Sequence, residues 1–311
     1  MKVGFWGVRG SYPVPGPSTN RYGGNTSCVQ VILEDGPIII IDAGTGIRLL
    51  GKQLMEGPCG KGQGEVHLLI SHTHWDHVQG LPFFAPLHRE GNLIRIYSRR
   101  QDDDQLNRIF AAVTDVSYFP IPIDEMKSRI EFVDLDEHSE FWVGDTKIRC
   151  RRLNHPSVAM AYRLDSNGES VVYASDTAPF RDLLMEHEFI AAPPGPDKGL
   201  EPEDAALLAK MRHELVELCR NADVVIYDTH FTREEYEDRP HWGHSTPEQA
   251  MEIISEAGAK KLFLFHHSPQ HTDEMMDEIL RETRLNGIPT VDVDAAREGE
   301  VIEIRRLRGT P

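Results

Sequence analysis

The sequence has few basic residues, and they do not gather in long runs. Its 311 residues include 33 Lys and Arg against 50 Asp and Glu, which gives a formal net charge of −17. Basic runs are pairs such as Arg99–Arg100, Arg151–Arg152 and Arg305–Arg306. A protein that wraps nucleic acid needs clustered positive side chains to neutralise phosphates. The sequence therefore predicts no extended nucleic-acid surface, and a polyanion can be recognised only at a local site.

Long apolar runs and paired cysteines are also missing. Runs such as Ile38–Ile41 are far shorter than the roughly 20 residues that a membrane helix needs, so no membrane segment is expected. Met1 leads directly into the strand-like residues 3–6, without a basic segment followed by an apolar run, so no signal peptide is expected either. Four cysteines are scattered without a CxxC pair: Cys28, Cys59, Cys150 and Cys219. Together these absences predict the reducing cytoplasm.

The composition, with 40% hydrophobic and 27% charged residues, is that of a globular protein. Short β-branched runs predict strands over residues 29–33, 38–41, 66–70, 94–97, 147–151, 171–174, 224–227, 262–265 and 301–304. Apolar residues at helical spacing predict helices over residues 204–220, 246–257 and 273–286. Because no stretch between them has the composition of a linker, we expect one α/β domain over residues 1–311.

Two segments fit no regular element. Gly7–Gly24 and Ala191–Glu203 are rich in Gly and Pro, and both are expected to be loops. Long structured loops often carry function. The sequence does not reveal the role of the second loop.

The sharpest motif is Ser71-His72-Thr73-His74-Trp75-Asp76-His77, directly after the predicted strand at residues 66–70. Neutral His and ionised Asp are preferred ligands of divalent transition metals. The spacing lets His72 and His74 serve one ion and lets Asp76 and His77 serve a second. The motif therefore predicts metal ligation, in preference to a polar surface turn.

One loop cannot complete two metal sites, so further ligands must come from other strand ends. His155 follows the strand at 147–151, Asp176 follows the strand at 171–174, and His266 ends the strand at 262–265. A single residue in such a position is usually only a turn residue. Three of them in a chain that already carries a metal motif favour ligation.

This pattern of HxHxDH, strand-end His, Asp and final His resembles the metallo-β-lactamase superfamily, from Gly7 to Ser268. The resemblance implies an αββα sandwich with the metals at one edge of two packed mixed sheets. It also implies that Asp176 bridges two ions. The implied ligands of the first ion are His72, His74 and His155, and those of the second are Asp76, His77 and His266.

Downstream motifs resemble the ribonuclease Z branch and its small phosphodiesterase relatives. They are His77-Val78-Gln79-Gly80-Leu81-Pro82, Gly243-His244-Ser245-Thr246 and Leu264-Phe265-His266-His267-Ser268. Two departures separate this chain from ribonuclease Z. Residues 227–231 read YDTHF where that family has HEATF, and no basic tRNA-clamping arm is evident. The candidate insertion at residues 181–204 instead holds seven acidic residues against Arg181 and Lys198.

The resemblance implies a binuclear-metal phosphodiesterase. Two divalent ions lower the pKa of a shared water and stabilise the oxygens of a phosphodiester during in-line displacement. Asp76 is expected to ligate and to orient the nucleophile. His244, which precedes a capped helix, is the predicted proton donor to the leaving alkoxide, and Asp228 is expected to hold one of its ring nitrogens.

The expected substrate is a small phosphodiester, preferably a cyclic nucleotide or a cyclic sugar phosphate. Alternatives are a tRNA 3′-end endoribonuclease of the ribonuclease Z kind and a metal-dependent module that binds or senses a nucleotide. Zinc is the expected metal, with manganese or iron also acceptable to these ligands. A homodimer is one of the assemblies that the sequence allows. The candidate substrate-binding residues are Ser11, Asn25, Thr26, His230 and His267.

Overall fold

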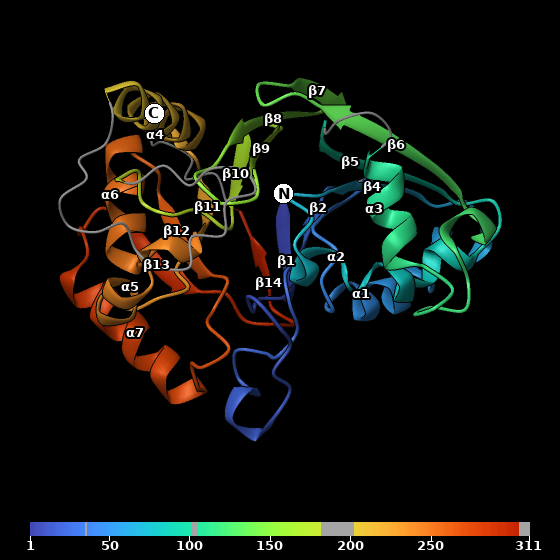
Figure 1. Cartoon of the computed structure of the whole chain (residues 1–311), viewed down its shortest axis with the longest axis horizontal. Helices are drawn as coiled ribbons and strands as arrows, with labels where there is room; N and C mark the ends of the chain where they lie inside the picture. The colour runs from blue at the N-terminus through green and yellow to red at the C-terminus, as the bar shows by residue number, and fades with distance from the viewer. Residues whose placement is uncertain (35, 101–104, 182–201, 305–311) are drawn as a thin grey trace. The chain divides into compact units, whose positions relative to one another are not determined.

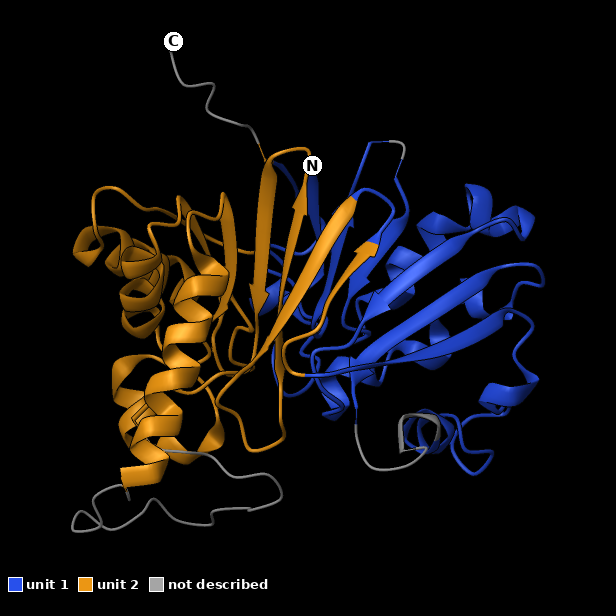
Figure 2. Ribbon diagram, turned by 90° about the horizontal axis from the view of Figure 1, so that it is seen from above, with its two compact units in different colours: residues 1–136, 143–145, 297–303 blue, residues 137–142, 146–296, 304–311 orange. Residues whose placement is uncertain are grey.

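The computed structural model describes residues 1–34, 36–100, 105–181 and 202–304. The chain forms two compact units (Figure 2): unit 1 comprises residues 1–136, 143–145 and 297–303, and unit 2 comprises residues 137–142, 146–296 and 304–311. The single domain over residues 1–311 stays a prediction. Most of the Ala191–Glu203 loop and of the acidic insertion lies outside the described residues.

Unit 1 contains a mixed sheet, which has seven strands in the described part of the chain (Figure 1). Strands β3 to β6 run parallel to one another, whereas β14, β1, β2 and β3 pair antiparallel. In spatial order the strands are β14 (Val301–Glu303), β1 (Lys2–Gly7), β2 (Cys28–Ile32), β3 (Ile38–Ile41), β4 (Glu65–Leu69), β5 (Leu93–Arg99) and β6 (Arg129–Leu135).

The alternation of side chains along these strands builds the core of unit 1. Val66 and Leu68 of β4 and Ile94 and Ile96 of β5 project from one face of the sheet, as the period of two in a strand requires. They join one apolar cluster with Leu50 and residues of the following helices. The helices of this unit are α1 (Ile47–Leu54), α2 (Trp75–Val78) and α3 (Gln105–Val113).

Unit 2 contains a second mixed sheet, again with seven strands among the described residues. Strands β10 to β13 run parallel, and β8, β9 and β10 pair antiparallel. In spatial order they are β13 (Asp292–Ala295), β12 (Lys261–Phe265), β11 (Val224–Asp228), β10 (Glu169–Ala174), β9 (Met160–Ser166), β8 (Thr146–Arg152) and β7 (Glu140–Val143). The parallel strands place their carboxyl ends at one edge of this sheet.

The helices of unit 2 are α4 (Pro202–Cys219), α5 (Arg233–Asp238), α6 (Pro247–Ala257) and α7 (Asp273–Asn286). Helix α6 packs on β11 and β12, and α7 packs on β13 (Figure 1). The start of α6 is fixed by a capping box between Thr246 and Gln249, and it ends at Gly258, whose φ is 65°. The residues before α6 are therefore held in a defined position.

The nine predicted strands and three predicted helices are all present, with ends shifted by up to two residues. On α4, Leu208 is buried, whereas Leu207 is 37% exposed. Strand β1 contains the strand-like residues 3–6, and strands β6, β7, β9 and β13 were not predicted. In the described part of the chain, none of the helices combines the length and the apolar character needed to cross a membrane.

Candidate metal and catalytic centre

The HxHxDH motif lies at the carboxyl end of β4, as predicted. His72 and His77 are buried with ring centroids 4.3 Å apart, and the His74 ring lies 4.6 Å from that of His72. Nε2 of His77 lies 3.3 Å from Oδ2 of Asp76. The segment from the end of β4 to α2 thus brings three imidazoles and one carboxylate close together.

Asp42 organises this cluster, and the sequence analysis missed it. It follows β3, whose carboxyl end adjoins that of β4 because the two strands are parallel. The completely buried Asp42 carboxylate accepts hydrogen bonds from Ser71 N at 2.7 Å, from Ser71 Oγ at 2.8 Å and from His77 Nδ1 at 2.8 Å. These bonds fix the tautomer of His77 and direct its Nε2 toward Asp76. The sequence does contain evidence for Asp42, because it is an Asp at the end of a buried strand. The same kind of position indicated Asp176.

Asp76 is held by the loop that follows β1. The backbone N–H of Ser11 donates a 2.7 Å hydrogen bond to Oδ2 of Asp76. Ser11 was predicted to contact substrate, but in this arrangement its backbone donor positions a carboxylate of the motif. Its φ of 63° is unusual for a residue other than glycine, and such strain is often found at functional sites.

His155 lies after β8 in unit 2, buried against the loop that precedes α6. Its Nδ1 donates a 3.0 Å hydrogen bond to the carbonyl oxygen of Gly243. Gly243 has a φ of 90°, and a Cβ atom there would lie 2.3 Å from His155 Nδ1. Only glycine therefore fits at position 243 without moving the imidazole. The bond leaves Nε2 of His155 on the side of Asp176, 4.0 Å from Oδ2.

Asp176 and His266 occupy the carboxyl ends of β10 and β12. Nε2 of His266 lies 3.1 Å from Oδ1 of Asp176, and both side chains are buried. Each residue has a φ of 60°. Left-handed backbone at a residue other than glycine costs of order 1–3 kcal/mol and persists where the surroundings enforce it. Unit 2 therefore brings the predicted His155, Asp176 and His266 together and holds two of them in strained backbone.

Asp228 and His244 form the predicted pair. His244 Nδ1 donates a 2.9 Å hydrogen bond to Oδ2 of Asp228, the last residue of β11. Asp228 also accepts bonds from the backbone N–H groups of Thr177 and His230, so its carboxylate has a fixed orientation. The ring of His244 lies 5.1 Å from that of His266. The pair is thus part of the same cluster as the unit 2 ligand candidates.

His230 stacks on His244 with ring centroids 4.4 Å apart and an interplanar angle of 21°. Its Nδ1 donates to the carbonyl oxygen of His266 at 2.9 Å. Burial lowers the pKa of His230 well below its ordinary value, and the neighbouring His244 and His266 lower it further. His230 is therefore a neutral ring that supports the positions of His244 and His266.

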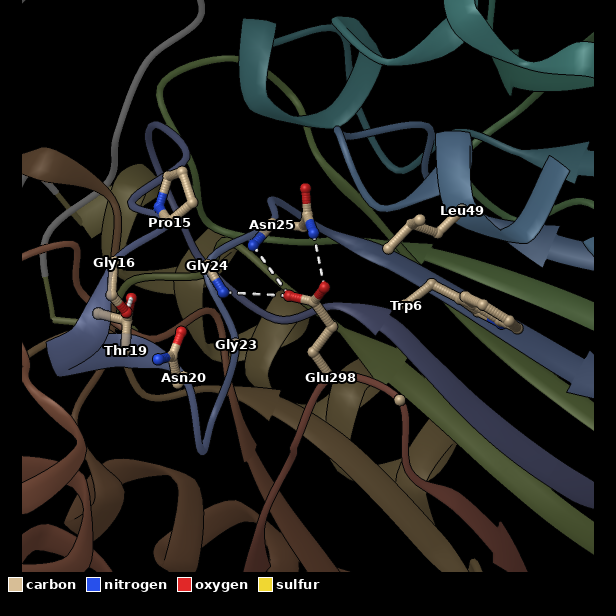
Figure 3. A pocket seen from close by; sticks show the side chains of 11 residues that line it. Trp6, Pro15, Gly16, Thr19, Asn20, Gly23, Gly24, Asn25, Leu49 and Glu298 are labelled. Carbon is tan, nitrogen blue, oxygen red and sulfur yellow. Dashed lines mark hydrogen bonds between the residues drawn. The ribbon is translucent and has the colours of Figure 1, made fainter. Parts of the chain in front are cut away.

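The other predicted substrate-binding residues have mainly structural contacts. Asn25 lies beside a cavity of about 280 Å³ in unit 1, where its backbone N–H and its side-chain amide both donate to Glu298 (Figure 3). Thr26 is completely buried and exchanges two 2.9 Å hydrogen bonds with Thr45. His267 is also completely buried, and its Nε2 donates to Ala296 O. Contact of these three residues with substrate stays a prediction.

The donor sets fit divalent metal ions. Nδ1 of His77 and of His155 is bonded to a protein acceptor, so each ring turns Nε2 toward a carboxylate. Bonding of one imidazole nitrogen to a carboxylate or carbonyl is the usual arrangement of metal-ligating His residues. Within unit 2, Nε2 of His266 lies 3.1 Å from Oδ1 of Asp176, and both side chains are buried. Clusters of buried His and Asp of this kind bind divalent metal ions.

Comparison with known proteins shows extended similarity. Residues 38–191 and 206–267 match the family described as the Beta-lactamase superfamily domain. The chain is 25% identical to ribonuclease Z of Haloarcula marismortui, with 89% of this chain and 90% of that protein covered. It is 27% identical to ribonuclease Z of Limosilactobacillus reuteri, with 76% and 80% covered.

Solved structures show the same fold at lower identity. The metallo-beta-lactamase fold protein YhfI of Bacillus subtilis has a TM-score of 0.64 and 19% identity, with 96% of this chain and 98% of that chain covered. Human tRNase Z, short form, has a TM-score of 0.60 and 21% identity, with 98% and 100% covered. A diphosphatase from the PhnP family has a TM-score of 0.60 and 16% identity, with 98% of both chains covered.

Proposed function

The chain belongs to the beta-lactamase superfamily and is a metal-dependent phosphodiester hydrolase, and we propose that its substrate is a small phosphodiester. A cyclic nucleotide or a cyclic sugar phosphate is the preferred form. The family and the α/β fold with two mixed sheets, both predicted from the motifs, are confirmed. The observation that carries the proposal is the buried Asp228–His244 pair beside Asp176 and His266, because an alkoxide leaving group needs a proton donor.

Seven side chains are the proposed metal ligands, as the resemblance to the superfamily implies. The proposed ligands of the first ion are His72, His74 and His155, those of the second are Asp76, His77 and His266, and Asp176 is shared. Zinc is the proposed metal because imidazoles predominate, and manganese or iron would also accept this set.

Bound divalent ions supply an activated water and neutralise charge on the phosphate. The protein's own residues orient the other participants. Ser11 holds Asp76 through a 2.7 Å hydrogen bond, so that this carboxylate can align the attacking water. Asp42 and Gly243 fix the rings of His77 and His155 in the same way.

His244 is the proposed general acid. The Asp228 carboxylate accepts from Nδ1 and stabilises the positive charge that the ring carries when protonated. The other nitrogen, Nε2, is then the one that gives its proton to the leaving alkoxide. General acids of this kind contribute typically 10²–10⁴-fold to the rate.

The charge of the protein favours a small substrate. A net charge of −17 repels a long polyanion outside the local site, whereas one cyclic diester needs only the metal ions and a few donors. A tRNA 3′-end endoribonuclease is the second candidate, favoured by the similarity to two proteins named ribonuclease Z. A module that binds a nucleotide without cleaving it is less well supported, since it has no need of the Asp228–His244 pair.

The test is an activity screen in which one preparation of the protein, with its metal content measured, is assayed on several substrates side by side. The substrates are bis(p-nitrophenyl) phosphate, the common cyclic nucleotides, a precursor tRNA and a lactone. We expect the highest kcat/KM on a small diester. A far higher kcat/KM on precursor tRNA would show that the protein is a ribonuclease instead. If metal-replete protein binds a nucleotide but hydrolyses none of the substrates, the protein is a nucleotide-binding module.

A further inference from the structure

Trp75 is an exposed indole inside the metal-binding motif. It lies between His74 and Asp76 in the sequence, and 59% of it is accessible to solvent. Its backbone is fixed, because the Gln79 N–H donates to the Trp75 carbonyl oxygen at 2.8 Å in the first turn of α2. A large apolar ring is thus held in water directly beside proposed ligands of the second ion.

Tyr12 is a second exposed aromatic residue near Asp76. Its side chain is 48% exposed, and it directly follows Ser11, whose N–H holds Asp76. The chain reaches this position through the left-handed backbone of Ser11 and a tight turn in which Tyr12 N donates to Gly10 O at 2.7 Å. This turn gives the backbone of Tyr12 a defined position, one residue from the Ser11 N–H that holds Asp76.

The Ser11–Asp76 hydrogen bond links these two aromatic residues. Tyr12 is bonded to Ser11 in the chain, and Trp75 is bonded to Asp76. Standard covalent geometry therefore keeps the Cα atoms of Tyr12 and Trp75 within about 15 Å of each other. Both belong to unit 1. Two exposed aromatic residues therefore adjoin, in the chain, the two partners of the bond that holds the carboxylate which, in the proposed function, aligns the attacking water.

We propose that Tyr12 and Trp75 form a binding site for the nucleobase of the substrate. The inference rests on the proposed function and narrows it, because it selects a cyclic nucleotide over a cyclic sugar phosphate. A base has two flat faces that stack on aromatic side chains whatever its sequence identity. A sugar phosphate has no such face, and it would gain little from two exposed rings.

The main test uses a substrate pair that differs only in the base. The pair is 3′,5′-cyclic AMP and the 3′,5′-cyclic phosphate of methyl riboside, in which a methoxy group replaces adenine. The variants are Trp75→Ala, Trp75→Phe, Tyr12→Ala and Tyr12→Phe. Trp142→Ala and Tyr118→Ala are matched controls, since these residues are 65% and 87% exposed and lie outside the motif.

Trp75→Ala and Tyr12→Ala should each lower kcat/KM for cyclic AMP by about 5- to 150-fold, the range that removal of a base-stacking ring produces. The value for the base-free diester should change less than about 2-fold. Both Phe variants should retain most of the activity because a flat ring remains. Equal losses on the two substrates, or equal effects of Trp75→Ala and Trp142→Ala, would contradict the proposal.

A binding measurement separates this inference from the proposed function. Wild type and variants at equal metal occupancy are titrated with adenosine 5′-monophosphate and with ribose 5-phosphate, using tryptophan fluorescence and calorimetry. The wild type should prefer the nucleotide, and Trp75→Ala should remove that preference. If no diester is hydrolysed, the proposed function fails. The aromatic site fails if wild type binds the two ligands equally or if Trp75→Ala keeps the preference for the nucleotide.

Discussion

The Asp228 carboxylate accepts a 2.9 Å hydrogen bond from Nδ1 of His244, and both side chains are buried. Because a carboxylate can only accept, Nδ1 must carry the proton of this bond. Any proton that His244 gives to a substrate therefore leaves from Nε2. The structure thus assigns different tasks to the two nitrogens of one ring.

Replacement of His244 should affect turnover and not metal content. His244→Ala is expected to lower kcat by about 10²–10⁴-fold on a diester with an alkoxide leaving group and much less on a p-nitrophenyl ester, which scarcely needs protonation. Asp228→Asn should show a weaker form of the same dependence. The measurement compares both variants on both substrates at full metal occupancy. Equal losses on the two leaving groups would mean that His244 positions substrate instead.

Asp42→Asn should weaken metal binding although Asp42 is not a proposed ligand. Asp42 accepts from Ser71 N at Oδ1 and from His77 Nδ1 at Oδ2, whereas an amide has one accepting oxygen; one of the two bonds is therefore lost, and the His77 ring is held less firmly. Loss of such a partner typically costs 10–100-fold in metal affinity. A chelator competition measures it, with Asp223→Asn as control, since Asp223 accepts from Ser170 in unit 2 before β11 begins. Unchanged affinity in Asp42→Asn would contradict the assigned role.

Gly243→Ala should displace His155. The new Cβ would lie 2.3 Å from His155 Nδ1, and the residue must also keep a φ of 90°. Gly299→Ala is a matched control, because Gly299 has a φ of 85° but its Cβ would meet no atom within 4 Å. Both variants should lose about 1–2 kcal/mol of stability from left-handed backbone. Only Gly243→Ala should also lose at least about 10-fold in activity and metal affinity; equal behaviour of the two would refute the steric argument.

Glu235 should make stability depend on pH in the acid range. Burial opposes its ionisation, but hydrogen bonds from His271 and from the Thr232 backbone N–H outweigh it and lower the pKa to about 2. A carboxyl with a lowered pKa in the folded state stabilises that state above its unfolded pKa, and the contribution disappears as the pH falls from about 4.5 to 2.

Glu235→Gln keeps the capping box of α5 and removes the charge. Its free energy of unfolding should be about 1–3 kcal/mol below wild type at pH 7, allowing for partial exposure, and the gap should narrow toward pH 3. Urea denaturation at both pH values measures it, with the neighbouring exposed Glu234→Gln as control. A gap that stays constant with pH would show that ionisation of Glu235 is not its origin.

The sequence predicted the ligand candidates because strand ends are recognisable. The runs at residues 171–174 and 262–265 are β-branched or apolar. Asp176 and His266 follow them within two residues, and the two side chains lie 3.1 Å apart. Asp42 was missed although it follows the run at 38–41, since the Ala-Gly-Thr-Gly after it resembles an ordinary turn. The left-handed backbone of Asp42, Asp176 and His266 is set by their surroundings and cannot be read from residue type.

Strands with charged side chains were the hardest part of the fold to predict. Strand β9 contains Arg163 and Asp165, which suggest a surface loop. In the structure, Arg163 donates to the carbonyl oxygens of Leu218 and Arg220 at the end of α4 and to Asp165 Oδ1. A buried charge with such partners is stable, but the partners are 55 and 57 residues away in sequence. Only tertiary structure reveals this compensation.

The most direct test of the central claim is metal titration of the metal-free protein with hydrolysis followed in parallel. We predict that the protein binds close to two divalent ions per chain and that phosphodiester hydrolysis rises with their occupancy. His74→Ala and Asp176→Ala should each lower this occupancy and abolish hydrolysis. Full activity in protein shown by metal analysis to be metal-free, or undiminished metal content in both variants, would contradict the account.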